Sequence, residues 1–468
     1  MRICLLQPPR PGGRGTNLLP PLGLLYLASS LEKAGHEVAL VDAALLGLSG
    51  EGLLRAVAGR EPDILMVSAF TSDVSSLACE MPRLREGLPA GTAMWLGGPH
   101  ASCRGAASLD DLPWFDAAFI GEAEETAVAA VSAFPAEPDI EGVIRRSAPR
   151  GTAPASIADL SALPLPAWHL APPGLYRGLP NGVVLRRSPY APILTTRGCP
   201  YHCTFCAGFR VTGRSLRHRP LRMVWDEIEL LRTRFGVREI HIEDDNFTFD
   251  RDYAMAFCEE AAARNTGLLF STPNGVRLDR LDPGLLSAMK RAGWYVIHCG
   301  IESGSDRILA GVRKATDTAS IRSAVRMIRD AGLPAAGYFI LGLPGETRQE
   351  MLQTISFAKG IGLAWAHFAA FLPIPGSEAG DSYLAAHGIP GGSWSTFHNT
   401  ACPAPPEGIS RAGLKAIQRR AFMSFYMRPR PFFRAVSLLF RGRHAARLAR
   451  RALEYLSPRA AADAGCAG

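Results

Sequence analysis

The stretch at residues 193–206 reads I-L-T-T-R-G-C-P-Y-H-C-T-F-C, a short apolar run that leads directly into three cysteines. The run predicts a buried strand. Cys199, Cys203 and Cys206 form the one cluster among ten cysteines. We expect these cysteines to be mostly reduced thiols, because the chain shows no secretory signal. Thiols at this spacing predict a metal centre on a loop that follows a strand.

The number of thiols indicates which metal centre this is. Three thiolates suit a cubane [4Fe-4S] cluster that keeps one iron open for a further ligand. The alternative is a structural zinc ion, which requires four ligands in a tetrahedron. His202 lies inside the loop, too close to complete the tetrahedron, and His218 is the more distant candidate. The cluster is the favoured interpretation.

Around this loop, short apolar runs alternate with helix-like stretches. We expect strands at 193–196, 240–243, 268–271, 296–302, 337–342 and 365–372. Six strands with helices between them predict a partial (β/α)6 barrel over 191–385. Barrel enzymes place their catalytic residues just after the strands, so the cysteine loop is expected at the active face.

Residues 1–145 show a second alternation of this kind. We expect strands at 3–6, 38–41, 64–70, 93–96 and 117–120, and helices at 22–34, 51–60, 75–87 and 122–134. This pattern predicts a parallel sheet with helices on both faces, a Rossmann-like (flavodoxin-like) α/β domain whose ligand binds at the carboxyl ends of the strands. The proline-rich segment 146–190 is expected to be a linker that lies over the surface.

The cysteine loop resembles that of the radical S-adenosylmethionine (SAM) superfamily, whose members share this barrel and carry an aromatic residue before the last cysteine. The resemblance implies that Cys199, Cys203 and Cys206 hold a [4Fe-4S] cluster whose fourth iron binds SAM. Cleavage of SAM then gives a 5′-deoxyadenosyl radical that abstracts hydrogen from a substrate carbon. Phe205 would lie against the adenine.

Other SAM contacts are implied by the same resemblance. E-D-D-N-F (243–247) departs from the G-G-E stretch that often contacts the SAM amino group, but it resembles cobalamin-dependent members and makes Asp245 a candidate. In G-I-E-S-G (300–304), Glu302 is similar in position to the acceptor of the SAM ribose hydroxyls, a role that suits a carboxylate. Lys314 falls where a cation pairs with the SAM carboxylate.

The remaining matches follow the third and fifth expected strands. Asn274 and Arg277 are further SAM candidates, and G-Y-F-I-L-G-L-P-G-E (337–346) resembles the adenine-contacting strand. Structural roles are the alternatives: a buried salt bridge for Glu302, a solvated lysine for Lys314, and a helix cap for Asp244 and Asp245.

The N-terminal domain resembles the cobalamin-binding domain of cobalamin-dependent radical SAM enzymes. The segments that carry this resemblance lie at 20–42, 62–72, 95–102 and 120–126. Gly97 and Gly98 let the backbone approach a flat ligand closely, and Ser68 and Thr71 offer hydroxyl groups at a strand end. The implied cobalamin contacts are Ser68, Thr71, Gly97, Gly98, His100, Gly121 and Glu122.

The cobalt-ligating motif D-x-H-x-x-G of methionine synthase-like domains is absent from the sequence. We therefore expect cobalamin to bind without a protein histidine on its lower face. Two alternatives stay open: His100 as a loop or core histidine, and a domain that has lost cobalamin.

The positive charge of the chain is concentrated at its C-terminal end. From Gly408 onward, 13 Lys and Arg stand against Glu454 and Asp463, a net +11, so the overall +8 leaves −3 for the rest. The region 386–468 is expected to form a basic helical cap on the barrel. Contact with a membrane surface or an anionic, lipid-like substrate is the alternative, and nucleic acid is not expected.

The lack of a secretory signal and of a membrane-spanning apolar run predicts a cytoplasmic protein. The resemblance implies a cobalamin-dependent radical SAM methyltransferase, in which methylcobalamin delivers a SAM-derived methyl group to an unactivated carbon of a natural-product or lipid-like small molecule. A flavodoxin or ferredoxin would supply electrons. The alternatives are a cobalamin radical SAM enzyme that cyclises or oxygenates its substrate, a methylthiotransferase acting on RNA or protein, and a non-enzymatic sensor. Methylthiotransferases carry three more cysteines in the N-terminal domain, but Cys4 falls inside the first expected strand and not in the loop after it.

Overall fold

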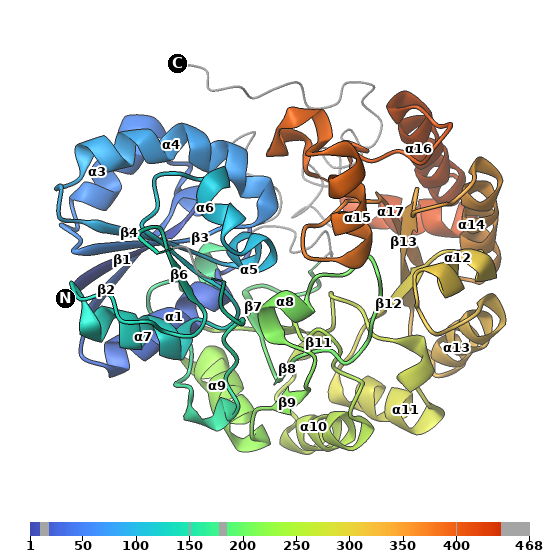
Figure 1. The fold of residues 1–468 in the computed structure, drawn as a ribbon. Coiled ribbons are helices and arrows are strands. Elements are labelled where there is room, and N and C mark those ends of the chain that lie inside the picture. Colours follow the sequence, from blue (N-terminus) through green and yellow to red (C-terminus); the bar gives the residue numbers. More distant parts are fainter. Residues whose placement is uncertain (10–17, 149–150, 177–184, 399, 441–468) are drawn as a thin grey trace.

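The computed structural model describes all residues except 10–17, 149–150, 177–184, 399 and 441–468, and describes only the backbone of 435–440. The N-terminal domain is built on a six-stranded sheet of order β2-β1-β3-β4-β5-β6 (Figure 1). Its strands are β1 (Arg2–Gln7), β2 (Glu37–Asp42), β3 (Ile64–Ser68), β4 (Ala93–Gly97), β5 (Ala117–Phe119) and β6 (Val143–Arg145). The first five strands are parallel, in the flavodoxin-like order that the sequence led us to expect.

Strand β6 departs from the expected all-parallel sheet, because it pairs antiparallel with β5 at the edge. It is three residues long, too short to show a hydrophobic period in the sequence.

Helices cover both faces of the sheet. Helices α1 (Leu22–Lys33) and α7 (Glu124–Ala133) pack on one face. The other face carries α2 (Ala43–Leu46), α3 (Gly50–Ala58), α4 (Val74–Gly87), α5 (Pro99–Arg104) and α6 (Ala107–Asp111).

The linker is packed more tightly than a surface segment. Ile157, Trp168 and Tyr176 are each 1% exposed, and the Trp168 indole N–H donates to Glu227 Oε1 at 3.1 Å. The linker has short 3-10 turns at Leu160–Ala162 and Pro173–Leu175. Large apolar side chains among the prolines explain the difference, because they bury their surface between the N-terminal domain and the barrel.

The barrel consists of two three-stranded parallel sheets, of order β11-β10-β7 and β12-β13-β14, joined by isolated bridges between Phe270 and Trp294 and between Val276 and Cys299. Its strands are β7 (Tyr190–Ile193), β10 (Glu239–Ile242), β11 (Leu269–Ser271), β12 (Ile297–Glu302), β13 (Ala335–Leu341) and β14 (Trp365–Ala370). The first strand begins earlier than the expected 193–196. Thr196–Arg197 instead forms β8, which pairs antiparallel with β9 (Arg217–His218).

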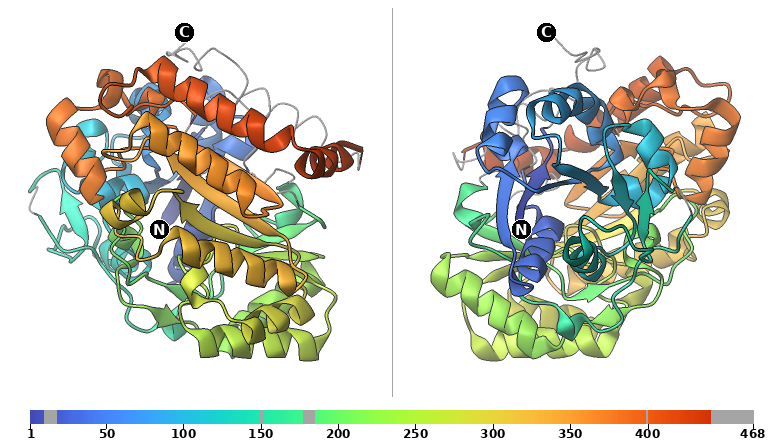
Figure 2. Two further views of the ribbon diagram at one scale, coloured as in Figure 1. Left: turned by 90° about the vertical axis from the view of Figure 1, so that its right-hand side faces the viewer. Right: turned by 60° about the vertical axis from the view of Figure 1, so that its left-hand side comes forward.

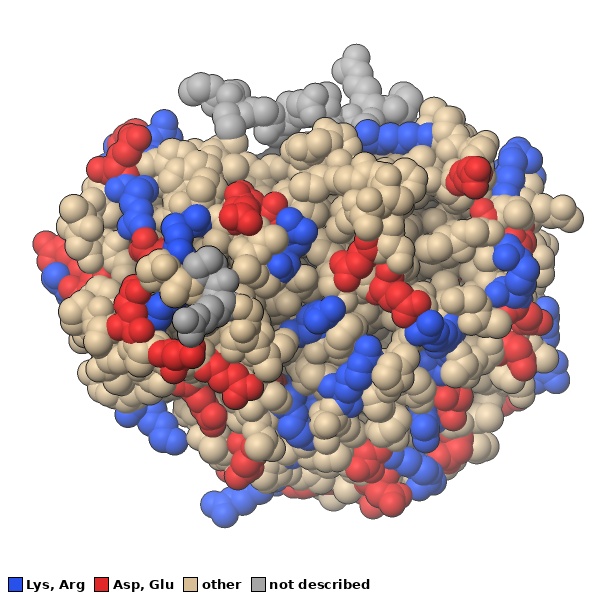
Figure 3. Space-filling model, in the orientation of Figure 1, with Lys and Arg blue, Asp and Glu red and all other residues tan. Residues whose placement is uncertain are grey.

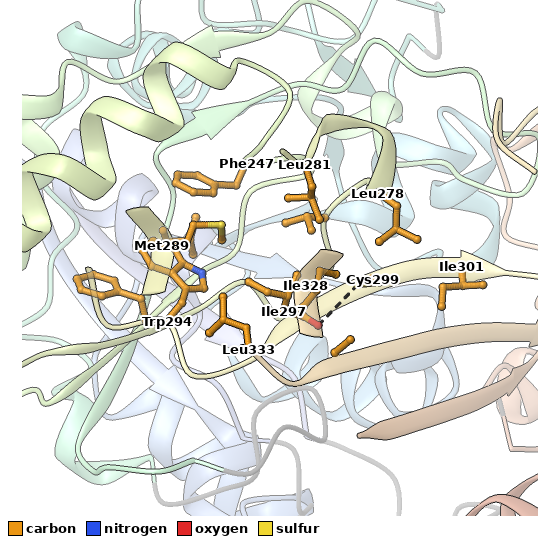
Figure 4. Close-up of a cluster of buried hydrophobic side chains, with 14 of the residues drawn as sticks. Phe247, Leu278, Leu281, Met289, Trp294, Ile297, Cys299, Ile301, Ile328 and Leu333 are labelled. Atoms are coloured by element: carbon orange, nitrogen blue, oxygen red, sulfur yellow. Dashed lines mark hydrogen bonds between the residues drawn. The ribbon is translucent and has the colours of Figure 1, made fainter. Parts of the chain in front are cut away.

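Helices wrap the outside of the barrel and bury alternate residues of each strand. On β12, Ile297, Cys299 and Ile301 belong to the core between the strands and these helices, which also contains Met289 and Ile328 (Figure 4). The intervening strand residues therefore face the interior. These helices are α9 (Leu221–Arg234), α10 (Arg251–Arg264), α11 (Pro283–Ala292), α12 (Asp306–Gly311), α13 (Thr318–Asp330) and α14 (Arg348–Gly360). The short helix α8 (Phe209–Thr212) follows the cysteine loop and buries none of its side chains.

The C-terminal region contacts both halves of the molecule and is not only a cap on the barrel. After α15 (Glu378–His387), the side chains of Trp394 and Phe397 join the core of the N-terminal domain. Helix α16 (Arg411–Tyr426) packs on β14 and α14, with α17 (Pro429–Phe440) beyond it (Figure 2). None of the helices in the described part of the chain combines the length and apolar composition that a bilayer-spanning segment needs.

Candidate active site

The cysteine loop is held at its base by the β8–β9 pair. Gly198 has a φ of +97°, and a Cβ added there would overlap the Ser215 carbonyl oxygen, so this position requires glycine. The Cys199 N–H donates to Gly213 O at 3.2 Å, and the Thr204 N–H donates to Val312 O at 3.1 Å. The loop therefore has fixed contacts both at its base and in its middle.

The three cysteines of the loop differ in exposure. Cys199 and Cys203 are half-buried, and Cys206 is exposed. The Gly208 N–H donates to Cys206 Sγ at 3.4 Å, the kind of hydrogen bond that tunes the potential of an iron-sulfur cluster.

Three thiols on one anchored loop fit a [4Fe-4S] cluster as a donor set. Within the described residues, no three His, Cys, Asp or Glu side chains are arranged around one metal ion. Each thiolate of a cubane binds a different iron atom, so the cluster does not require that arrangement. His218, the alternative zinc ligand, lies with Nε2 3.1 Å from Asp250 Oδ2.

The two aspartates after β10 have separate roles, and neither caps α10, whose N-cap is Asp250. Asp244 is buried and accepts hydrogen bonds from the backbone N–H and hydroxyl groups of Thr195 and Thr196. Burial raises its pKa to about 6 against the effect of these bonds. Asp245 is exposed and accepts from the Thr212 hydroxyl at 2.6 Å. Desolvation by the surrounding protein nevertheless raises its pKa, against the effect of the hydrogen bond from Thr212.

Glu302 and Lys314 form a buried ion pair at the end of β12. Lys314 Nζ lies 2.7 Å from Glu302 Oε1, and both side chains are 10% exposed. Burial lowers the pKa of Lys314, but the Glu302 carboxylate outweighs this effect and holds it above its usual value. A Cβ on Gly300 would lie 2.7 Å from Glu302 Oε1 and 3.0 Å from Lys314 Nζ. The ion pair therefore depends on glycine at position 300.

Arg277 lies between this ion pair and the cysteine loop. Its Nη2 donates to Lys314 O at 2.6 Å, and its guanidinium lies 3.6 Å from the centre of the Tyr201 ring. Its Nη1 is buried without a hydrogen-bond partner in the structure. A buried, unpaired guanidinium N–H is expected to find an anionic partner when a ligand binds.

The other two SAM candidates lie around the same loop. The Asn274 amide donates to Glu243 O at 2.7 Å, at the carboxyl end of β10. Phe205 is half-buried, and Lys314 Nζ lies 6.0 Å from its ring centre. Ile340 and Leu343, in and just after β13, belong to the same apolar cluster as Phe205.

The carboxyl edge of the N-terminal sheet carries several of the cobalamin candidates. Ser68 ends β3 and Gly97 ends β4. Gly98 has a φ of +89°, and a Cβ there would lie 2.7 Å from Ser68 Oγ, so glycine lets these two strand ends approach closely.

His100 lies in the core of the domain. It is fully buried, with Nδ1 3.3 Å from Thr71 Oγ1 and Nε2 3.3 Å from Asp111 Oδ2. Burial raises the pKa of Asp111, but hydrogen bonds from His100 and Arg104 hold it below its usual value. One ring nitrogen of His100 thus lies beside the Thr71 hydroxyl and the other beside the Asp111 carboxylate.

Gly121 and Glu122 contact other parts of this chain. Gly121 pairs with Ala155 of the linker, and a Cβ there would overlap the Ala155 carbonyl oxygen. Glu122 is 4% exposed and forms ion pairs with Arg197 and Arg217, which flank the cysteine loop.

Sequence reasoning missed Arg197, Arg217 and Glu124, the other members of this ion-pair group. Arg197 also pairs with Glu124 at 2.7 Å. The sequence showed only that two arginines flank the cysteine loop and that two glutamates follow a strand of the N-terminal domain. Nothing in their spacing predicts that they meet.

The cysteine loop touches the N-terminal domain at a second place. Helix α8, which follows Cys206, packs against α5. Arg210 Nε donates to Gly376 O at 3.1 Å, and a Cβ on Gly376 would lie 3.1 Å from Cys103 O. Acidic and basic side chains are interspersed over the face of the molecule that shows this junction (Figure 3). The helix that follows the carboxyl edge of β4 thus lies against the helix that follows the cysteine loop.

Comparisons with known proteins match the two halves of the chain to two families. Residues 193–358 match the radical SAM superfamily, and residues 13–131 match the B12 binding domain. The chain is 30% identical over 415 residues to cytidylyl-2-hydroxyethylphosphonate methyltransferase of Streptomyces wedmorensis, covering 76% of each chain. The protein belongs to the cobalamin-dependent radical SAM enzymes. Its cofactors are therefore a [4Fe-4S] cluster, SAM and cobalamin.

Other relatives of this radical SAM enzyme include methyltransferases and a cyclase. It is 28% identical to an uncharacterized methyltransferase of Pyrococcus horikoshii, covering 92% of this chain and 93% of the relative. It is also 28% identical to the anaerobic magnesium-protoporphyrin IX monomethyl ester cyclase of Rubrivivax gelatinosus, covering 81% of this chain and 69% of the relative.

Two solved structures share the fold of this enzyme. The cobalamin-dependent SAM radical enzyme OxsB, with aqua-cobalamin and SAM bound, has a TM-score of 0.73 at 15% identity, covering 97% of this chain and 72% of OxsB. The radical SAM methyltransferase TsrM of Kitasatospora setae, with tryptophan and a SAM analogue bound, has a TM-score of 0.66 at 20% identity, covering 82% and 76%.

Proposed function

We propose that this enzyme is a C-methyltransferase that moves a methyl group from SAM, by way of cobalamin, to an unactivated carbon of a small-molecule substrate. Two methyltransferase relatives that align over most of the chain support this proposal. When bound, the cluster and SAM supply a carbon-centred radical, and cobalamin supplies a methyl carrier. The protein has to position these groups and the substrate and exclude water.

In this proposal, SAM binds between the cysteine loop and the ends of β10, β11 and β12. Glu302 accepts hydrogen bonds from the ribose hydroxyls, an arrangement that its carboxylate and buried position favour. Lys314 and the unpaired Nη1 of Arg277 attract the SAM carboxylate. Asp245, whose side chain is exposed, accepts from the SAM amino group, and Phe205 lies against the adenine. Asn274 adds a polar contact at the strand end.

Cobalamin binds, in this proposal, at the carboxyl edge of the N-terminal sheet. Gly97 and Gly98 let the backbone approach the macrocycle, and Ser68 and Thr71 offer hydroxyl groups. The two ring nitrogens of His100 are engaged inside the protein, which fits a lower cobalt face without a protein histidine.

The observation that carries the proposal is the junction of the two halves. Helix α8, directly after the cysteine loop, lies against α5, directly after the carboxyl edge of β4. A methyl carrier bound at this edge and a radical source bound at the loop would face the same space. Methyl transfer to a substrate radical requires this proximity.

The test uses SAM with an isotopically labelled methyl group. The reconstituted enzyme is incubated anaerobically with reductant, labelled SAM and the small-molecule fraction of an extract from its host. We expect new products that carry the label and formation of 5′-deoxyadenosine. New products without the label would overturn methyl transfer and favour cyclisation or oxygenation, the alternative that the cyclase relative supports.

Methylthiotransferase activity remains the minor alternative. One putative methylthiotransferase of Methanocaldococcus jannaschii aligns with 41% of this chain. Cys4, however, is fully buried within β1. Iron content distinguishes a methylthiotransferase from the proposed C-methyltransferase, since a methylthiotransferase needs a second cluster.

For partners, we propose a flavodoxin or ferredoxin as electron donor and peripheral membrane contact through the basic C-terminal helices.

A further inference from the structure

A buried group of four charged side chains joins the N-terminal domain to the base of the cysteine loop. Glu122 Oε1 lies 3.1 Å from Arg197 Nη1, and Glu122 Oε2 lies 2.5 Å from Arg217 Nη1. Arg197 Nη2 lies 2.7 Å from Glu124 Oε1. The Glu122 side chain is 2% exposed and that of Arg197 is 5% exposed. Two carboxylates and two guanidinium groups are balanced in charge.

Hydrogen bonds link this group of charged side chains to residues near the cysteines. Arg217 Nη2 donates to the Thr212 carbonyl oxygen, and the Thr212 hydroxyl donates to Asp245 Oδ2 at 2.6 Å. A Cβ on Gly208 would lie 3.5 Å from Asp245 Oδ1 and 3.6 Å from Cys206 Sγ, so the carboxylate and the thiol flank the same point. A chain of contacts thus runs from Glu122 to Asp245, which lies on one side of Gly208 while the Cys206 thiol, hydrogen-bonded by the Gly208 N–H, lies on the other.

Buried ion pairs contribute little to stability when an apolar cluster could replace them, but removing one partner leaves a costly unpaired charge. They do fix a single arrangement of the elements they join. Here those elements are the loop after β5, the linker through the Ile157 N–H at 2.7 Å from Glu122 Oε2, and the β8–β9 pair. Arg197 stands two residues before Cys199.

We propose that Glu122 is a positioning residue that fixes the cluster loop against the cobalamin domain, acting through Arg197 and Arg217. The sequence had suggested Glu122 as a direct cobalamin contact. Its two carboxylate oxygens are instead occupied by protein donors. The proposal concerns how the two cofactor sites are aligned and does not depend on which group the enzyme transfers.

The test compares charge-removing variants of the reconstituted holoenzyme. Glu122→Gln leaves buried positive charge beside the loop, so the midpoint potential of the cluster should rise and iron loss to a chelator should accelerate by about tenfold. Arg217→Gln leaves negative charge and should lower the potential. The double variant should return the potential close to that of the unmodified enzyme. All three should retain cobalamin.

Glu227→Gln is the matched control. Glu227 is equally buried and pairs with Arg219 at 2.6 Å, but none of its contacts reaches the cysteine loop. It should lower the unfolding temperature without moving the potential or the rate of iron loss. If Glu122→Gln is insoluble, Arg217→Gln alone must lower the potential.

Two results would overturn the proposal. In one, the Glu122 or Arg217 variants lose stability as the Glu227 variant does, with unchanged potential and iron loss, and the group is then only a structural ion pair. In the other, Glu122→Gln loses cobalamin while its cluster is unaffected, and Glu122 is then a cobalamin contact.

Discussion

Single residues of the proposed SAM site are held by close contacts with their neighbours. The Glu302–Lys314 pair occupies the space that a side chain at position 300 would take. Glu302 itself has a φ of +67°, an unusual conformation for a non-glycine residue at a strand end. Such backbone strain is typical of functional sites and agrees with a ligand-binding role for Glu302.

Gly300→Ala should therefore weaken SAM binding. The added methyl group displaces the Glu302 carboxylate and the Lys314 ammonium group, and we expect a loss of at least about tenfold in affinity. Equilibrium dialysis with radiolabelled SAM measures the change. Gly360→Ala, at a position with no atom within 4 Å of the added Cβ, is the control. Equal affinity in the two variants would contradict this role for the ion pair.

Glu346 should make stability depend on pH. It is 2% exposed, and burial raises its pKa from 4.5 to about 7, although the Gly342 and Leu343 N–H groups donate to it. The folded state thus holds the proton more tightly than the unfolded state. Its contribution falls as the pH rises from about 4.5 through about 7, by roughly 3 kcal/mol at most.

Glu346→Gln removes this dependence, because the amide is neutral at every pH. We expect the variant to be more stable than the unmodified enzyme at pH 8 and close to it at pH 5. Urea unfolding at both pH values measures the difference. The same pH dependence in both proteins would contradict the interpretation.

Secondary-structure elements were largely predictable from the sequence, and the exceptions have specific causes. The run I-L-T-T (193–196) was expected to be the first barrel strand, but Thr195 and Thr196 bind Asp244 and are not in the β7 ladder. An apolar run shows that a segment is buried, but it does not show which residues pair. Thr195 and Asp244 are 49 positions apart, so the sequence around either residue does not indicate that they contact each other.

We expect helix α16 to contribute to the stability of the barrel, because it packs on the barrel core. Phe425 is fully buried, with its ring centre 6.2 Å from that of Phe368 on β14. Phe425→Ala should lower the free energy of unfolding by about 3–5 kcal/mol. Met427→Ala, at a side chain that is 65% exposed, should change it by less than about 0.5 kcal/mol. Similar urea midpoints for the two variants would show that α16 does not support the barrel.

At the scale of the whole molecule, the sequence predicted two cofactor domains but not how they meet. Motifs mark Cys199 and Glu302 because their chemistry is local. The ion pairs of Glu122 with Arg197 and Arg217 span 75 and 95 positions, so only the folded chain brings them together. For the same reason the packing of Trp394 into the N-terminal core was not foreseen.

The C-terminal helices also expose an apolar and basic surface. Met423, Met427, Phe432 and Phe433 are exposed. Residues 411–434 contain seven Lys and Arg and no Asp or Glu. Exposed aromatic side chains among arginines favour contact with an anionic membrane.

We therefore expect the enzyme to co-sediment with phosphatidylglycerol vesicles, and less so at high salt. Phe432→Ser combined with Phe433→Ser should reduce binding several-fold, whereas Leu46→Ser, an exposed leucine of the N-terminal domain, should not. Equal binding by the two variants, or none by the unmodified enzyme, would contradict membrane contact.

The central claim is that one chain holds both cofactors in one site for methyl transfer. The most direct measurement is cofactor content after anaerobic reconstitution with iron, sulfide and hydroxocobalamin, followed by gel filtration. We expect about one cobalamin and about four iron atoms per chain. A variant with Cys199, Cys203 and Cys206 replaced by alanine should keep the cobalamin and lose the iron. Four iron atoms without cobalamin would contradict the methyltransferase proposal.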